Sequence, residues 1–211
     1  MNEEHEYAVL GGLNRASIGR YLAVASALIA AGVVYLLLFL NSVWKSHGYN
    51  YDIPQSLVSL VTAGSIYLAL YWLFSRHAWK LPLLASFLRV PNLSGNWLCD
   101  GQTVNADKTL GYKWSGRVTV IQSWDKVRVR LRTPQSGSNS ITAALVYDEA
   151  DGFRLLYNYI NEPKIGEPEL NAHRGFADLM FNKDLTVAEG EYFNGHGRFT
   201  FGTMRWTKEG T

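Results

Sequence analysis

Charge and cysteine are both scarce in this sequence. Charged residues make up 18% of the 211 residues, and 20 Lys and Arg against 18 Asp and Glu leave a formal net charge of +2. So small a basic excess excludes a protein that holds DNA or RNA polymers through a broad positive surface. The single cysteine, Cys99, excludes a disulfide within the chain and favours a reducing compartment for the soluble part.

The sequence also lacks the short motifs that mark common catalytic and metal centres. It contains no phosphate-binding glycine loop, no Gly-x-Ser-x-Gly, no His-Glu-x-x-His and no cysteine cluster. His173 and His196, with the scattered aspartates, do not have a recognisable metal-ligand spacing. We therefore expect no enzymatic activity, no metal and no cofactor.

Charge is missing altogether from two apolar stretches, and these predict a transmembrane hairpin. The first, 21–40, has about the length that an α-helix needs to cross the ~30 Å core of a bilayer. A signal peptide is the alternative, but no small-x-small cleavage motif follows the stretch. The second stretch, 57–74, ends in tyrosine and tryptophan, as membrane interfaces favour. We expect the transmembrane region to cover residues 1–80.

Basic residues flank the predicted hairpin on its outer sides. Arg15 and Arg20 precede it, and Arg76 and Lys80 follow it, so the positive-inside rule places both termini and the rest of the chain in the cytoplasm. Small residues recur along both predicted helices, which suits packing within the hairpin or between protomers. Residues 81–91, with leucines at helical spacing, predict an interfacial linker on the inner leaflet.

From Leu93 onward, apolar residues alternate at a period of two, and turn residues recur about every ten positions. This pattern predicts an all-β domain over 92–211. Short connections between successive strands indicate antiparallel neighbours, and eight of them favour an up-and-down β-barrel of the lipocalin or streptavidin type, because closure removes exposed edges. An open sandwich is the alternative. The expected strands are 94–103, 112–123, 126–133, 138–148, 153–162, 170–181, 186–193 and 198–207.

The predicted strand 153–162 carries the candidate ligand site. One of its faces changes from Phe and Leu to Tyr157, Tyr159 and Asn161, which is typical of a barrel with a packed floor and a wet mouth. Tyrosine rings stack on flat ligands, and Asn161 offers both a donor and an acceptor to a nucleobase. Glu162 accepts hydrogen bonds, but alternation points it to the other face.

Two further candidates come from neighbouring predicted strands. His173 can donate to a phosphate when protonated, or reach a sugar hydroxyl when neutral. Gln122 shares the inward parity of strand 112–123. In strand 126–133 the same alternation predicts Arg128, Arg130 and Arg132 on a solvated outer face, with a partner domain or anionic lipid headgroups as the alternative.

Several segments together carry a resemblance to a known family. Behind the two predicted transmembrane helices, the segments SGNWLCDG, VTVIQSW, TPQSGSNS, YNYINEP, AHRG and GEYFNGHG resemble the two-transmembrane, β-strand-rich effectors of bacterial cyclic-oligonucleotide-based antiphage signalling (CBASS). The resemblance implies that the barrel binds a cyclic dinucleotide made by a partner CD-NTase-type synthase. It further implies that the protein then oligomerises and disrupts the bacterial inner membrane, which kills the infected cell. The ligand contacts that it implies are Asn161, Glu162, Tyr159, Thr133, Ser138 and His173.

Three alternatives stay open at the level of sequence. Within the same class, the nucleotide can instead restrain the effector until a phage depletes it. A membrane-anchored, lipocalin-like carrier or scaffold would hold a lipid or a protein partner. A membrane-bound hydrolase would use Glu162 and His173 as an acid/base pair.

Overall fold

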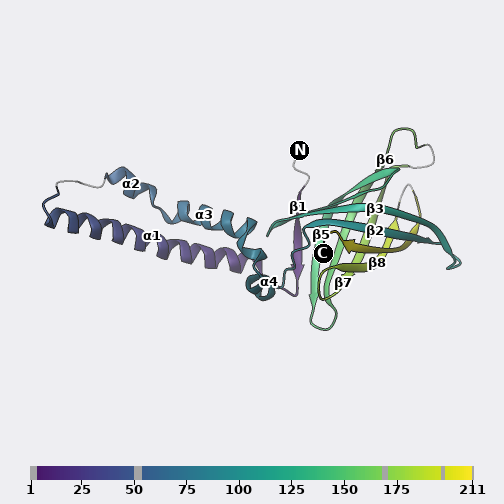
Figure 1. The fold of residues 1–211 in the computed structure, drawn as a ribbon, viewed down its shortest axis with the longest axis horizontal. Coiled ribbons are helices and arrows are strands. Elements are labelled where there is room, and N and C mark those ends of the chain that lie inside the picture. The colour runs from purple at the N-terminus through teal and green to yellow at the C-terminus, as the bar shows by residue number, and fades with distance from the viewer. Residues whose placement is uncertain (1–3, 50–53, 168–170, 196–197, 211) are drawn as a thin grey trace. The chain divides into compact units, whose positions relative to one another are not determined.

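A computed structural model describes residues 4–49, 54–167, 171–195 and 198–210. The chain divides into two compact units, Leu13–Trp79 and a second unit that joins Met1–Gly12 to Lys80–Thr211. The first unit is helical, and the second consists mainly of strands (Figure 1).

Helix α1 (Arg15–Ser46) contains the first predicted transmembrane stretch. It is 32 residues long and, among the described residues, it is the one helix long and apolar enough to cross a membrane. Asn14 caps its N-terminus, because the Asn14 side-chain oxygen accepts a hydrogen bond from the Ala16 amide at 2.8 Å. The predicted span over 21–40 therefore lies inside one continuous helix.

The second predicted span, 57–74, is not one helix. The structure breaks it into α2 (Gln55–Leu60) and α3 (Ala63–Arg76), of which α3 packs against α1. Thr62 starts a new helix at the break: its hydroxyl accepts from the Ser65 amide at 3.0 Å, and the Ser65 hydroxyl accepts from the Thr62 amide at 3.1 Å. This capping box satisfies amides that an unbroken helix would bond internally. The expectation of a hairpin of two unbroken helices is wrong on this point.

The expected linker 81–91 contains a short helix. After a 3-10 turn (Ala78–Lys80), α4 (Pro82–Leu88) begins with proline at a first-turn position and ends at Arg89 in a left-handed conformation. Leu88, Val90 and Leu93 are buried. That this segment lies on a membrane surface stays a prediction.

Within the residues that the structure describes, the strands form one closed ring of nine, in the order β1-β4-β3-β2-β9-β8-β7-β6-β5. The eight expected strands correspond to β2–β9, which run antiparallel to their sequence neighbours. Closure rules out the open sandwich, and the expected number of eight strands is wrong, because a ninth strand completes the ring. The strands are β1 (His5–Leu10), β2 (Gly95–Val104), β3 (Leu110–Gln122), β4 (Lys126–Arg132), β5 (Ser136–Asp148), β6 (Gly152–Pro163), β7 (His173–Phe181), β8 (Val187–Asn194) and β9 (Phe201–Lys208).

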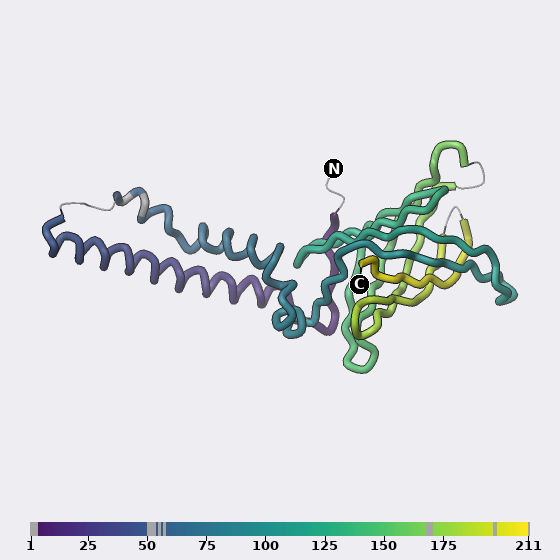
Figure 2. Tube along the Cα trace, viewed as in Figure 1, coloured from purple at the N-terminus to yellow at the C-terminus, as the bar shows by residue number. Residues whose placement is uncertain are grey.

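The unexpected strand is β1, which precedes the membrane helix in the sequence. It pairs antiparallel with β4 at His5 and Glu6, and parallel with β5 from Tyr7 to Leu10. In Figure 2 it is the purple strand beside the teal and green strands of the ring. One closed sheet therefore contains strands from both sides of the helical unit in the sequence.

Aromatic residues fill one end of the ring. Trp97 and Trp206 are fully buried, with ring centroids 6.2 Å apart, and Trp97 meets Phe181 edge to face at 5.6 Å. Buried aliphatic residues such as Leu155 and Leu179 complete this core. The packed floor that the sequence predicts is present, and the other end of the ring is hollow.

Candidate ligand-binding cavity

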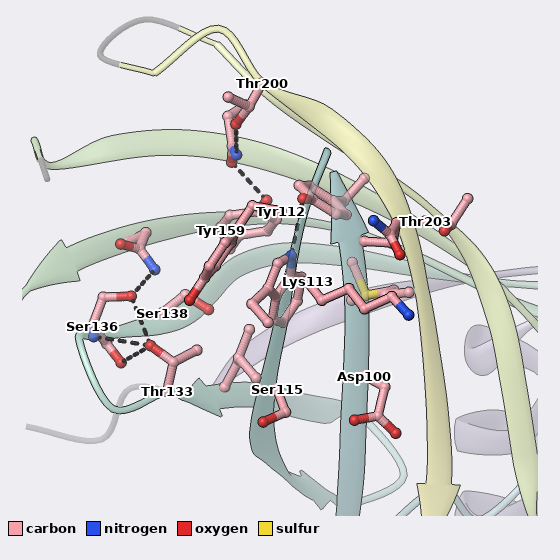
Figure 3. A pocket seen from close by; sticks show the side chains of 18 of the residues that line it. Asp100, Tyr112, Lys113, Ser115, Thr133, Ser136, Ser138, Tyr159, Thr200 and Thr203 are labelled. Carbon is pink, nitrogen blue, oxygen red and sulfur yellow. Dashed lines mark hydrogen bonds between the residues drawn. The ribbon is translucent and has the colours of Figure 1, made fainter. Parts of the chain in front are cut away.

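The hollow end of the ring holds a cavity of about 1030 Å³. Its wall is made by residues of β2 to β9 and by the loop between β8 and β9 (Figure 3). Pockets for small ligands are typically ~300–1,000 Å³, so this cavity has room for a ligand as large as a dinucleotide.

Asn161, near the end of β6, is the most informative residue of the wall. It is 8% exposed, and its amide Nδ2 donates to the Ser136 hydroxyl at 3.1 Å. Its carbonyl Oδ1 is buried and accepts no hydrogen bond. An unsatisfied buried acceptor costs about 1–3 kcal/mol, which a ligand donor reaching this atom would recover.

The turn between β4 and β5 fixes Ser136, and through it Asn161. The Thr133 hydroxyl accepts from the Ser136 amide at 3.0 Å and from the Gln135 amide at 3.3 Å, and it donates to the Ser136 carbonyl at 3.2 Å. Thr133 therefore closes the turn and leaves little hydrogen-bonding capacity for a ligand. Ser136 was not among the sequence candidates, although it shares the parity of Ser138 in the same serine-rich segment (Figure 3).

Tyrosines form the apolar part of the wall. Tyr157 and Tyr159 are buried, with ring centroids 5.9 Å apart, and the Tyr159 hydroxyl donates to Asn194 Oδ1 at 2.8 Å. Burial raises the pKa of both phenols, so both are neutral. Trp114 donates to the Tyr192 hydroxyl at 3.0 Å. Tyr192 and Asn194 are not among the residues predicted from sequence, although both lie on the inward parity of β8.

His173 enters the cavity from the first residue of β7. It is buried, and its Nδ1 donates to the Asn171 carbonyl at 2.9 Å, which leaves Nε2 of the neutral ring as an acceptor. Burial lowers the pKa of His173, and the positive charge of Arg198 lowers it further. Of the two predicted modes, contact with a sugar hydroxyl suits this neutral imidazole better than contact with a phosphate.

The structure brings six of the eight sequence candidates together: Asn161, Tyr159, Tyr157, His173, Thr133 and Ser138 all line the cavity. Glu162 is exposed and lies outside the lining, so it does not form a pair with His173. Gln122 is also outside the lining: it accepts from the Leu93 amide at 2.8 Å and donates to the Pro91 carbonyl at 3.1 Å. Gln122 thus holds the segment that leads into β2.

The arginines of β4 lie where alternation places them. Arg128 donates to Asn139 Oδ1 at 2.9 Å, and Arg130 and Arg132 follow on the same face of the strand. They alternate with Val127 and Val129, which are buried inside the ring. The ligand cavity therefore takes no charge from this row.

These features define a class of protein: a receptor with a closed β ring around a small-ligand cavity, joined in the sequence to an apolar helix that can cross a membrane. The family model described as "Cap15, cyclic dinucleotide receptor domain" matches residues 88–208, and "Cap15, TM helices" matches residues 16–80. CD-NTase-associated protein 15 of Yersinia aleksiciae is 45% identical over 206 residues, which cover 98% of each chain. The chain belongs to the Cap15 family, and the resemblance to CBASS membrane effectors is confirmed.

Proposed function

We propose that this protein is an antiphage effector that binds a cyclic dinucleotide in the cavity of its β ring, self-associates and disrupts the inner membrane. The ligand would come from a partner CD-NTase-type synthase, and membrane disruption would kill the infected cell. The observation that carries the proposal is the buried Asn161 Oδ1, an unpaired acceptor inside a cavity walled by tyrosines. A flat base with a donor on its edge is the complement of that arrangement.

The remaining lining residues suit the other parts of such a ligand. The neutral Nε2 of His173 would accept from a ribose hydroxyl, and Arg198 in the β8–β9 loop would meet a phosphate. Ser136 and Ser138 add hydroxyls to the wall. This polarity disfavours the fatty ligand of a lipocalin-like carrier.

The closed ring supports a multi-pass arrangement. Strand β1 precedes α1 in the sequence and β2–β9 follow α3, yet all nine strands share one sheet. Both flanks of the helical unit must therefore lie on one side of the membrane, so an even number of crossings is needed. We infer that the chain crosses once through α1 and returns through residues 55–76. The basic flanks at Arg15, Arg20, Arg76 and Lys80 favour a cytoplasmic position for the ring and both termini.

Substituting Asn161→Ala tests the proposed site. We expect affinity for cyclic dinucleotides, measured by calorimetry on the full chain in detergent, to fall by about 10- to 100-fold, because one buried hydrogen bond contributes about 1–3 kcal/mol. The melting temperature should stay near that of the wild type, because the free protein also loses an unsatisfied acceptor.

Asn158→Ala is the matched control. Asn158 lies on the same strand but is exposed, and its amide donates to the Thr142 hydroxyl at 3.1 Å. The Asn158→Ala variant should bind cyclic dinucleotides with the affinity of the wild type. Wild-type affinity in Asn161→Ala would remove Asn161 from the site.

A further inference from the structure

The ring has a seam, which we define as the facing edges of β4 and β5 between which β1 lies. β4 and β5 pair directly over Arg130–Arg132 and 137–139. Beyond that region β1 fills the space between them, paired with Lys126 and Val127 on one side and with 143–146 on the other. β1 has six residues, fewer than any other strand of the ring that the structure describes.

Few side chains hold β1 in the seam. Tyr7 is 3% exposed, and its hydroxyl donates to the Trp124 carbonyl at 3.1 Å. The Tyr7 hydroxyl also donates to the Ser123 carbonyl at 3.3 Å and accepts from Gln122 Nε2 at 3.3 Å. His5 Nε2 lies 2.7 Å from the Ser140 hydroxyl. In contrast, Glu6, Ala8 and Leu10 are exposed. Strand β1 is thus attached by backbone pairing and by the polar contacts of two side chains, Tyr7 and His5.

The seam is connected to the cavity through β5. Ser136, Ser138 and Ser140 lie on one face of this strand: the first two line the cavity, and the third contacts His5 and accepts from the Val129 amide at 2.9 Å. The pairing register of β5 with β6 shifts between Ser140 and Thr142. If a ligand bound at Ser136 and Ser138 displaced β5, Ser140 would move with the strand. The contact between Ser140 and His5 of β1 would then change.

The seam is also connected to the membrane helix through the sequence. Gly11, at φ +78°, and Gly12 follow β1, and α1 begins at Arg15. Glycine accepts positive φ at no steric cost, which permits the chain to turn between β1 and α1. If β1 left the seam, β4 and β5 would present unpaired strand edges, which bind an added strand.

We propose that the seam is a docking site for β1 of a second copy of this chain, so that ligand-bound protomers exchange N-terminal strands. The inference rests on the proposed ligand of the cavity. A second copy is the fitting occupant, because its β1 carries the same Tyr7 and His5 and can adopt the same register. Membrane anchoring raises the local concentration of the copies. Head-to-tail exchange joins protomers in series, as heterologous contacts do.

Cysteine pairs across the seam test the exchange. Ala8 lies directly opposite Ala144, so entry of β1 of one molecule into the seam of another brings Ala8→Cys and Ala144→Cys of separate full-length molecules within disulfide distance. Cys99→Ala provides the background; burial raises the pKa of the native Cys99 thiol to about 12. With oxidant and a cyclic dinucleotide, we expect several-fold more crosslinked heterodimer on a non-reducing gel than without nucleotide.

Two further variants serve as a control for random collision and as a direct test of strand exchange. Asn158→Cys, exposed on β6, replaces Ala144→Cys as a control for random collision and should not give a nucleotide-dependent crosslink. The double variant Ala8→Cys with Ala144→Cys, oxidised within one molecule, should bind nucleotide more weakly than the wild type, because a ligand that favours release of β1 binds the locked ring less tightly, and it should fail to assemble. Normal assembly of this locked variant would overturn the proposal.

Calorimetry on the same samples separates the two hypotheses. If nucleotide binds but the amount of crosslinked heterodimer does not rise, strand exchange is refuted and the proposed ligand is not. No binding by the wild type refutes the proposed ligand, and with it the exchange that the ligand would cause.

Discussion

His173 shows how the wall of the cavity sets the charge of a residue. Burial disfavours the imidazolium, so the pKa of His173 in the folded protein lies below the 6.5 of an ordinary histidine. Below about pH 6.5 the unfolded chain therefore binds more protons than the folded one at this position. The contribution of His173 to stability is present above that pH and is lost as the pH falls.

We expect the melting temperature of the wild type to drop more between about pH 7.5 and pH 5.5 than that of His173→Asn. Asparagine keeps a donor near the position of Nδ1, so the contact with the Asn171 carbonyl can persist. Melting curves from tryptophan fluorescence at both pH values give the comparison. Parallel pH dependence in the two proteins would contradict a depressed pKa.

At the level of single residues, alternation is a good guide to the cavity wall. It correctly turns Tyr157, Tyr159 and Asn161 inward and Glu162 outward. It does not tell which polar atoms are already satisfied. Thr133 is used by its own turn, and Gln122 by the segment before β2, and both partnerships depend on residues that folding brings together.

Among the elements, β2 and β3 pack closely where Gly101 of β2 lies opposite Trp114 of β3. A Cβ at Gly101 would lie 2.1 Å from the Trp114 ring, so Trp114 occupies the space of the missing side chain. Gly101→Ala should push the indole away from the Tyr192 hydroxyl and destabilise the protein by about 1–3 kcal/mol, the usual effect of overpacking. Because Trp114 and Tyr192 line the cavity, nucleotide affinity should fall as well.

Gly137→Ala is the control for this prediction. Its added Cβ would lie 3.8 Å from the Leu131 carbonyl oxygen, which is an ordinary contact. Chemical denaturation and calorimetry on both variants measure the two effects. Equal stability of Gly101→Ala and Gly137→Ala would mean that Trp114 moves aside freely.

The elements differ in how far sequence predicts them. The antiparallel strands from β2 onward are predictable, because each contains enough alternation and pairs with a sequence neighbour. Hydropathy does not predict the break before α3, because it counts Thr62 and Ser65 as parts of an uncharged run, whereas their hydroxyls bond to backbone amides. Strand β1 is not predictable in this way, because its partners lie far away in the chain: His5 contacts Ser140, 135 residues later.

For the whole molecule, the proposed sensing and the proposed membrane disruption should be separable by one charge in α1. Leu28 lies near the middle of the apolar part of α1 and is 69% exposed. An arginine near the centre of a membrane helix costs about 2.5–3.5 kcal/mol on insertion scales. We expect Leu28→Arg to bind cyclic dinucleotides with wild-type affinity but to lose killing, because the charge opposes membrane insertion.

Leu28→Ala serves as the control and should retain both properties, since alanine keeps the helix uncharged. Cell viability with a co-expressed synthase measures killing, fractionation measures insertion, and calorimetry measures binding. Killing by membrane-inserted Leu28→Arg would show that the apolar surface of α1 around this position is not needed.

The place of β1 in the ring also sets the order of events during synthesis. The strand leaves the ribosome first, but its contact at Ser140 is made 135 residues later, which at ~5–20 residues per second is roughly 7 to 27 s. α1 is complete early in that interval, whereas the partners of β1 in β4 and β5 are synthesised only towards its end. A nascent chain therefore carries its apolar helix before it has a complete receptor, and any chain that terminates before β5 can never close the ring.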